Sequence, residues 1–128
     1  YIYLPFILVM CTIFFLSSQS SLPVKHMFTM QDKVFHFIAF ACLGYGLYRI
    51  LRFHQHKPIV ITLVTIGVCG LYGLSDEIHQ SFVPNRVFDW WDLFADVLGV
   101  CFACSIGKFL FRKDLELFSF LFKKQIKI

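Results

Sequence analysis

The chain contains little charge. Only 16% of its 128 residues are charged, whereas 58% are hydrophobic. Soluble domains carry about 25% charged residues, so this composition argues against an ordinary water-soluble domain. The seventeen phenylalanines fit lipid-facing helix surfaces better than a compact soluble core. The length leaves no room for a separate soluble module, so we expect one integral membrane domain over residues 1–128.

The chain also lacks a disulfide framework and a nucleic-acid-binding pattern. All five cysteines lie inside apolar stretches: Cys11, Cys42, Cys69, Cys101 and Cys104. The C-x-x-C spacing at Cys101 has no second pair, which favours small packing residues over a redox or metal site. The basic residues flank hydrophobic stretches, where anionic lipid head groups attract them. We therefore expect membrane lipids as partners, no nucleic acid and no cofactor.

Long hydrophobic runs are abundant. A helix needs about 20 apolar residues to cross the hydrocarbon core, and four stretches approach that length: residues 1–16, 34–51, 58–74 and 92–111. Because the first is short and begins with Tyr1 rather than Met, we expect residues before it. The predicted fold class is all-α, a polytopic bundle of four transmembrane helices. Residues 115–122 are either an interfacial helix on the inner leaflet or a frayed end of the fourth span.

Charge is distributed unevenly between the two sides of such a bundle. The loop after the second span and the tail after the fourth together hold nine basic and two acidic residues. The other two loops and the adjacent helix ends hold three basic and six acidic residues. We expect a multi-pass protein of the plasma or inner membrane. The positive-inside rule predicts that its C-terminus is cytoplasmic and that its acidic segment is extracytoplasmic.

The acidic residues gather in three places on that outer side. They accompany other polar residues at the start of the second span (Asp32, Lys33, His36), the end of the third (Asp76, Glu77, His79, Gln80) and the start of the fourth (Asp89, Asp92, Asp96). An ionisable group at the centre of a membrane helix costs about 2.5–3.5 kcal/mol on insertion scales, so such groups favour a functional interpretation. Short connections make the three spans neighbours. We therefore predict one converging polar cluster that also includes Arg86.

The residue types indicate candidate roles. Paired carboxylates with histidines are the usual parts of acid–base catalysis or metal-assisted hydrolysis. The candidate catalytic residues are Asp76, Glu77, His79, His36 and Asp92. The candidate binding residues are Asp32, Lys33, Gln80, Arg86, Asp89 and Asp96, of which Lys33 and Arg86 suit a phosphate head group. We expect no metal, because a site would need three helices to converge; instead we expect His36 to bond to Asp32 or Asp76.

A second pattern is structural. Ala95, Gly99, Ala103 and Gly107 recur every fourth residue in the fourth span, which places small side chains along one stripe of the helix. Such stripes let neighbouring helices approach closely. We therefore predict that this stripe packs inside the bundle and does not form a ligand site.

The polar residues resemble the motif of the VanZ-like family of small membrane proteins. The resemblance rests on Asp32-Lys33-x-x-His36-Phe37 and on the segment from Ser75-Asp76-Glu77-x-His79-Gln80 through Pro84, Arg86, Asp89 and Asp92 to Asp96 and Gly99. The Ser17-Ser18-Gln19 end of the first span is also similar. Asp96 is a departure, since many relatives have Asn there.

The resemblance implies a link to resistance against teicoplanin, a lipoglycopeptide that acts at the outer membrane face. The paired carboxylates and histidines favour an enzyme acting on a lipid or lipid-linked precursor of the cell envelope. Two alternatives stay open. The cluster binds a precursor or lipoglycopeptide without chemistry, or it only holds the helix bundle together.

Overall fold

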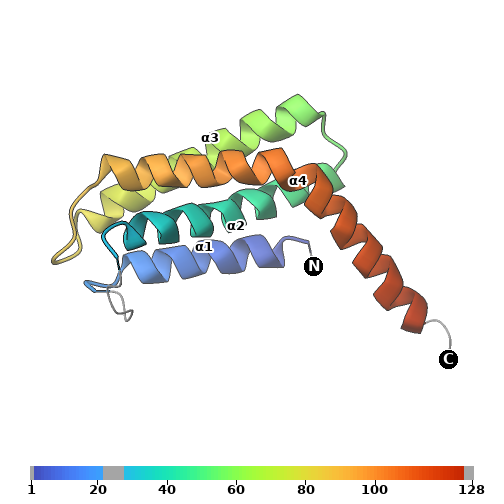
Figure 1. The fold of residues 1–128 in the computed structure, drawn as a ribbon, viewed down its shortest axis with the longest axis horizontal. Coiled ribbons are helices and arrows are strands. Elements are labelled where there is room, and N and C mark those ends of the chain that lie inside the picture. The colour runs from blue at the N-terminus through green and yellow to red at the C-terminus, as the bar shows by residue number, and fades with distance from the viewer. Residues whose placement is uncertain (1, 22–27, 126–128) are drawn as a thin grey trace.

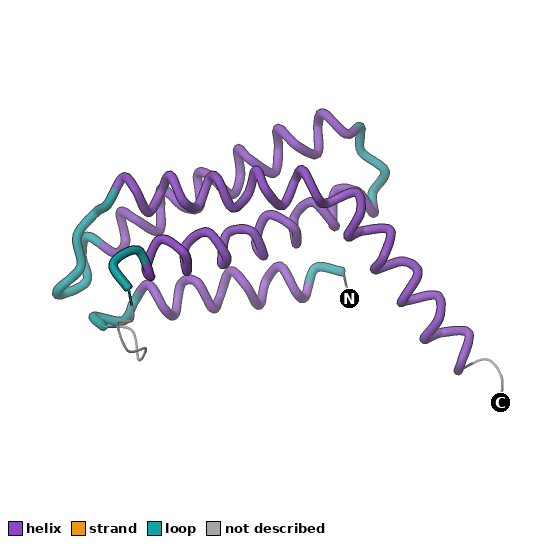
Figure 2. Tube along the Cα trace, in the orientation of Figure 1, coloured by secondary structure: helices purple, strands orange, loops and turns teal. Residues whose placement is uncertain are grey.

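The computed structural model describes residues 2–21 and 28–125, and this part of the chain forms four helices without strands (Figures 1 and 2). The helices are α1 (Leu4–Ser17), α2 (Gln31–Phe53), α3 (Pro58–Gln80) and α4 (Trp90–Gln125). The all-α prediction is therefore confirmed. Three segments are long and apolar enough to cross a membrane: α2, α3 and Trp90–Lys113 of α4. The 14-residue α1 is shorter.

The helices continue past the hydrophobic stretches from which they were predicted. Helix α2 begins at Gln31 rather than at 34, and α3 ends at Gln80 rather than at 74. Pro58 opens α3, as expected from the fixed φ of proline and its missing N–H. The extra turns exist because backbone hydrogen bonding does not stop where the side chains become polar. As a result, most of the polar cluster lies on helices rather than on loops.

Helix α2 is the centre of the bundle. It packs against all three other helices and makes its largest interface with α4. The small-residue stripe of α4 lies in that interface: Ala103 is 2% exposed, and a Cβ added to Gly107 would meet the ring of Tyr48. The predicted packing of the stripe inside the bundle is confirmed.

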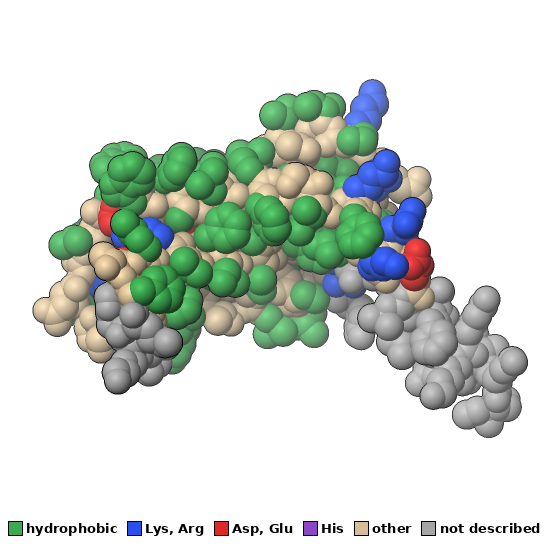
Figure 3. All heavy atoms as spheres, viewed as in Figure 1, with side chains coloured by type: hydrophobic (Ala, Val, Ile, Leu, Met, Phe, Trp, Pro, Cys, Tyr) green, Lys and Arg blue, Asp and Glu red, His purple; other side chains and the backbone are tan. Residues whose placement is uncertain are grey.

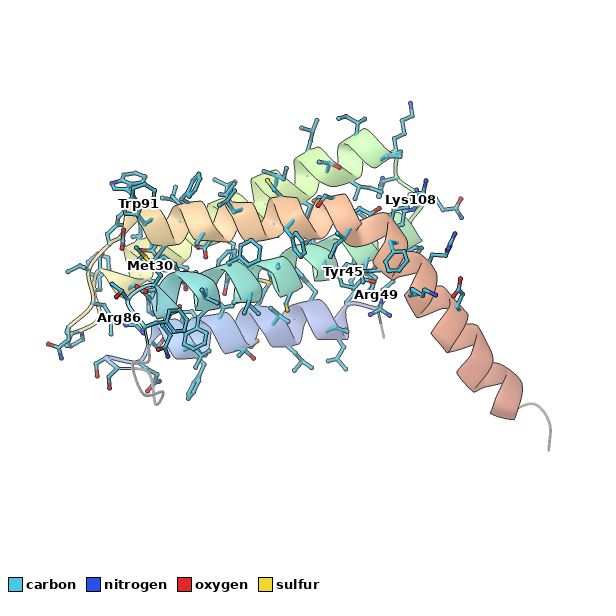
Figure 4. The ribbon with its side chains drawn as sticks, viewed as in Figure 1. Met30, Tyr45, Arg49, Arg86, Trp91 and Lys108 are labelled. Carbon is cyan, nitrogen blue, oxygen red and sulfur yellow. The ribbon has the colours of Figure 1, made fainter. Side chains whose placement is uncertain are left out.

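The face of the bundle drawn in Figure 3 carries hydrophobic side chains along most of its length. Large hydrophobic side chains are exposed on every helix, for example Leu8, Ile38, Leu71 and Phe102. Charged side chains lie at both ends of the bundle: Arg49 and Lys108 lie at one end, and Arg86 lies at the other, where Trp91 is also found (Figure 4). An apolar belt between two polar ends is the surface expected of a bundle that spans a bilayer.

Helix α4 continues without interruption to Gln125, and its last part leaves the bundle (Figure 1). The backbone of residues 115–122 is helical and continuous with the fourth span. The side chains needed to distinguish an interfacial helix from an extension of that span lie outside the described residues, apart from the exposed Glu116.

Candidate functional site

The site lies at the end of the bundle where α2 begins, α3 ends and α4 begins. Lys33 on α2 joins three carboxylates there. Its Nζ lies 2.8 Å from Asp32 Oδ2, 2.5 Å from Asp89 Oδ2 and 2.7 Å from Asp92 Oδ1. Lys33 therefore offsets part of the negative charge of these three acids, which form the outer layer of the acidic cluster.

Asp89 has a second role as the N-terminal cap of α4. Its Oδ1 accepts a 2.8 Å hydrogen bond from the Trp91 N–H, which satisfies one of the free amides of the first turn. Two hydrogen bonds lower the pKa of the Asp89 carboxyl. The larger effect comes from Lys33 and the smaller one from the Trp91 N–H. Asp89 is therefore a carboxylate with a fixed orientation at the start of α4.

A deeper layer contains one imidazole and two fully buried acids. His36 Nδ1 donates to Asp96 Oδ1 over 2.9 Å and lies 4.0 Å from Glu77 Oε1. Glu77 and Asp96 are both 0% exposed. His36 Nε2 is 3.9 Å from Asp92 Oδ2, too far for a direct hydrogen bond. Three helices thus converge on His36, which is only 13% exposed in its side chain.

These two buried acids are incompletely satisfied. Glu77 Oε2 accepts a 3.0 Å bond from the Asp89 N–H, but Glu77 Oε1 has no hydrogen-bond partner. Asp96 Oδ2 also has none. A buried carboxylate oxygen without a partner is unusual and calls for an explanation.

A second polar group links α3 to α1. Asp76 Oδ2 accepts 2.9 Å bonds from Ser17 Oγ and from Gln80 Nε2. All three side chains belong to buried residues. Beside this group, Arg86 Nε donates to the Gln19 carbonyl over 3.2 Å. The end of α1 is thereby tied to the same end of the bundle.

A cavity of about 300 Å³ lies between α1 and α2 and extends to both polar groups. Its walls are mostly apolar, formed by residues such as Ile13, Phe35 and Phe40. Its polar lining comes from Ser17, Asp32, His36, Asp76, Gln80 and Arg86. A mostly apolar pocket with a few polar groups at one place is the usual form of a ligand site.

The predicted site residues therefore lie at one end of the bundle, where their hydrogen bonds and ion pairs form two networks. The deep group and its lysine layer contain Asp32, Lys33, His36, Glu77, Asp89, Asp92 and Asp96. Asp76, Gln80 and Arg86 also line the cavity, and they bond to Ser17 and Gln19 at the end of α1.

Two details of the sequence prediction change. His79 does not join His36: it stacks on Phe14 at 5.0 Å between ring centroids, and its Nε2 bonds to Ser18 Oγ. It lies on a different face of α3 from Glu77. The expected partner of His36 was also wrong, because His36 bonds to Asp96 rather than to Asp32 or Asp76. His36 and Asp96 lie far apart in the sequence, and their spacing did not indicate that they would pair.

Sequence reasoning left Ser17 out of the site, although it is buried, lines the cavity and donates to Asp76. The signal was present, since Ser17-Ser18-Gln19 ends the first apolar run with three polar residues. All three contact site residues: Ser18 bonds to His79, and the Gln19 carbonyl accepts from Arg86.

Comparison with known proteins agrees with this motif. The family model described as VanZ/LLP1 matches residues 2–112. The protein with the printed name "Uncharacterized protein C11E3.10" from Schizosaccharomyces pombe (strain 972 / ATCC 24843) is 31% identical over 111 residues. The match covers 87% of this chain and 65% of that relative. No solved structure matches the chain significantly. The matched region contains every site residue described above, and the chain belongs to the VanZ/LLP1 family.

Proposed function

We propose that the protein acts on a lipid or lipid-linked component of the cell envelope at the outer face of the membrane. An apolar chain of this substrate enters the cavity between α1 and α2, and its head group reaches the polar cluster. The observation that carries the proposal is the cavity itself, which joins apolar walls to His36, Asp76 and Arg86.

The cavity is suited to an amphipathic ligand. Its apolar walls can pack against a hydrocarbon chain, and Arg86 supplies a cation at the polar end. A guanidinium binds phosphate oxygens through several N–H donors, and Nε is the donor occupied by the Gln19 carbonyl. An anionic head group, such as a phosphate or diphosphate, is therefore the preferred ligand class.

The deep group supplies the chemistry. His36 lines the cavity and is held by the buried Asp96 at a distance of 2.9 Å. A histidine oriented by a carboxylate, with further acids nearby, has the parts for acid–base catalysis or metal-assisted hydrolysis. Hydrolysis of a phosphate ester or anhydride in the head group is the reaction that these residues favour.

The orientation follows from charge. The site end of the bundle holds most of the acids, while the opposite end and the tail hold basic residues such as Arg49 and Lys108 (Figure 4). By the positive-inside rule, the site then faces the extracytoplasmic side and the C-terminus lies in the cytoplasm, with α1 as a fourth span. An outer-face site is also where a lipoglycopeptide or its precursor target would be encountered.

The test is turnover by purified protein in lipid nanodiscs. A polyprenyl-diphosphate-linked sugar is incubated with wild type, Glu77→Gln and Glu116→Gln, and the products are identified by mass spectrometry. We expect released phosphate products with wild type and with Glu116→Gln, which removes an exposed acid far from the site. We expect none with Glu77→Gln. Absence of turnover across lipid phosphates and diphosphates would refute the enzymatic part.

A second candidate function is binding without chemistry. It is favoured by the completeness of the outer contacts, since Lys33 pairs with three acids and Asp76 receives two hydrogen bonds. In that case, the lipid would bind with the same affinity to wild type and to Glu77→Gln, and both proteins would release it without chemical change. If neither protein bound lipid, the cluster would serve only to hold the helices together.

A further inference from the structure

We propose that His36, Glu77 and Asp96 bind a divalent metal ion. One residue comes from each of α2, α3 and α4, and their ligand atoms all lie within 4.8 Å of one another. This proposal replaces the sequence-based expectation of no metal, because three helices do supply one ligand each. Metal binding itself requires no lipid, whereas the use of the ion in hydrolysis rests on the proposed function.

The distances fit a shared ion. Ligand atoms about 2.1 Å from one metal are about 3.0 Å apart when adjacent and about 4.2 Å apart when opposite in octahedral geometry. His36 Nδ1 is 2.9 Å from Asp96 Oδ1 and 4.0 Å from Glu77 Oε1. Small side-chain rotations are therefore sufficient to direct all three ligand atoms toward one point.

The unpartnered oxygens point to the same conclusion independently. Glu77 Oε1 and Asp96 Oδ2 are buried without a hydrogen-bond partner, on two acids that are 0% exposed. Leaving a charged oxygen in this state is costly. A divalent ion would accept lone pairs from both acids and compensate their charge, which the single His36 cannot do alone.

The surroundings are arranged as an outer ligand shell. The Asp89 N–H holds Glu77 Oε2 at 3.0 Å, which leaves Oε1 as the free ligand atom. Lys33 pairs with Asp32, Asp89 and Asp92, so its charge is directed to the outer layer. Such contacts orient metal ligands, and their loss typically weakens affinity about 10–100-fold.

The donor set indicates the kind of ion. Two carboxylates suit a hard ion such as Mn²⁺, the imidazole nitrogen also suits a borderline ion such as Zn²⁺, and this donor set contains no thiolate to favour a softer metal. Three protein ligands leave positions open for water or a phosphate oxygen, as in catalytic metal sites. The ion would supply charge stabilisation and an activated water at the polar end of the cavity.

The experiment measures metal binding without substrate. Full-length protein in detergent is stripped with a chelator, and MnCl₂ is added while electron paramagnetic resonance records free Mn²⁺. We expect saturable binding of one ion per chain, with affinity reduced at least about tenfold in Glu77→Gln and in Asp96→Asn. The control is Glu116→Gln, which removes an exposed acid outside the site and should bind Mn²⁺ with the affinity of wild type.

A second pair of variants keeps every charge. A Cβ at Gly73 would lie 2.9 Å from Asp96 Oδ2, whereas a Cβ at Gly70 would meet nothing within 4 Å. Gly73→Ala should therefore weaken Mn²⁺ binding relative to Gly70→Ala, and this pair decides the question if the acid variants do not fold. No saturable Mn²⁺ or Zn²⁺ binding by folded wild type would overturn the proposal. Equal Mn²⁺ affinities of wild type, Glu77→Gln and Asp96→Asn, or of Gly73→Ala and Gly70→Ala, would also overturn it. Metal binding without lipid turnover would instead refute only the proposed function.

Discussion

Substitution of Gly99 tests how closely α2 and α4 approach. A Cβ at this position would overlap the Phe37 carbonyl oxygen and lie 3.0 Å from the Ala41 nitrogen. Both atoms belong to the α2 backbone, which cannot rotate away as a side chain can. Gly99→Ala therefore forces the two helices apart along their largest interface.

The magnitude follows from two opposing terms. Overpacking typically costs about 1–3 kcal/mol, and a clash with backbone lies at the upper end of that range. Replacing glycine by alanine inside a helix stabilises the folded state by about 1 kcal/mol. The expected net loss for Gly99→Ala is therefore about 2 kcal/mol. Gly70→Ala on α3 meets nothing within 4 Å and should gain up to about 1 kcal/mol.

The assay is reversible unfolding of both variants in the same mixed micelles, followed by circular dichroism as denaturing detergent increases. The two alanine variants should differ by about 3 kcal/mol, with Gly99→Ala the less stable. Because both changes add one methyl group to a helical glycine, intrinsic propensity cancels in the comparison. Equal stability of the two variants would show that α2 and α4 do not make this close contact.

Three further predictions concern the polar end and the orientation of the bundle. Lys33→Met should destabilise the protein by roughly 3 kcal/mol in chemical unfolding, because it leaves carboxylates uncompensated. Adding Asp92→Asn should restore part of that loss, and full additivity of the two stability changes would contradict the ion pair. Ser17→Ala should cost about 1–3 kcal/mol in the same assay, because Asp76 loses a buried donor, whereas Ser105→Ala on the exposed surface of α4 should have little effect. With the native cysteines replaced, a cysteine introduced at Ser20 should react with an impermeant thiol reagent outside intact cells, and one introduced at His56 should not. The reverse labelling pattern would show that the proposed orientation is wrong.

Hydrophobicity predicted the number and order of the helices because the apolar runs are long and are separated by short polar segments. It could not predict where α2 begins or where α3 ends. Gln31 and Gln80 are buried at 6% and 3% exposure, although their polarity places them outside the apolar runs. Their burial comes from contacts between helices, which are tertiary features that a single stretch of sequence does not contain.

The site could be located from sequence but not resolved in detail. The density of acids from Asp76 to Asp96 predicted the end of the bundle at which the polar cluster lies, because charges near a bilayer must be gathered and compensated. The pairing within it depends on how each helix is rotated about its axis. Glu77 and His79 are only two residues apart, yet this rotation directs Glu77 to the bundle interior and His79 toward α1.

Charge compensation is uneven across the site, and this unevenness gives the deep group its chemical character. Lys33 meets Asp32, Asp89 and Asp92 in the outer layer. Asp76 is satisfied by neutral donors from Ser17 and Gln80. The two most buried acids, Glu77 and Asp96, instead share one imidazole and retain oxygens without partners. A cluster that served only to hold the helices together would be expected to satisfy its most buried members first, because they are the most costly to leave unpaired. Since the opposite arrangement is found, the deep group is better explained as a site that is completed by something it binds.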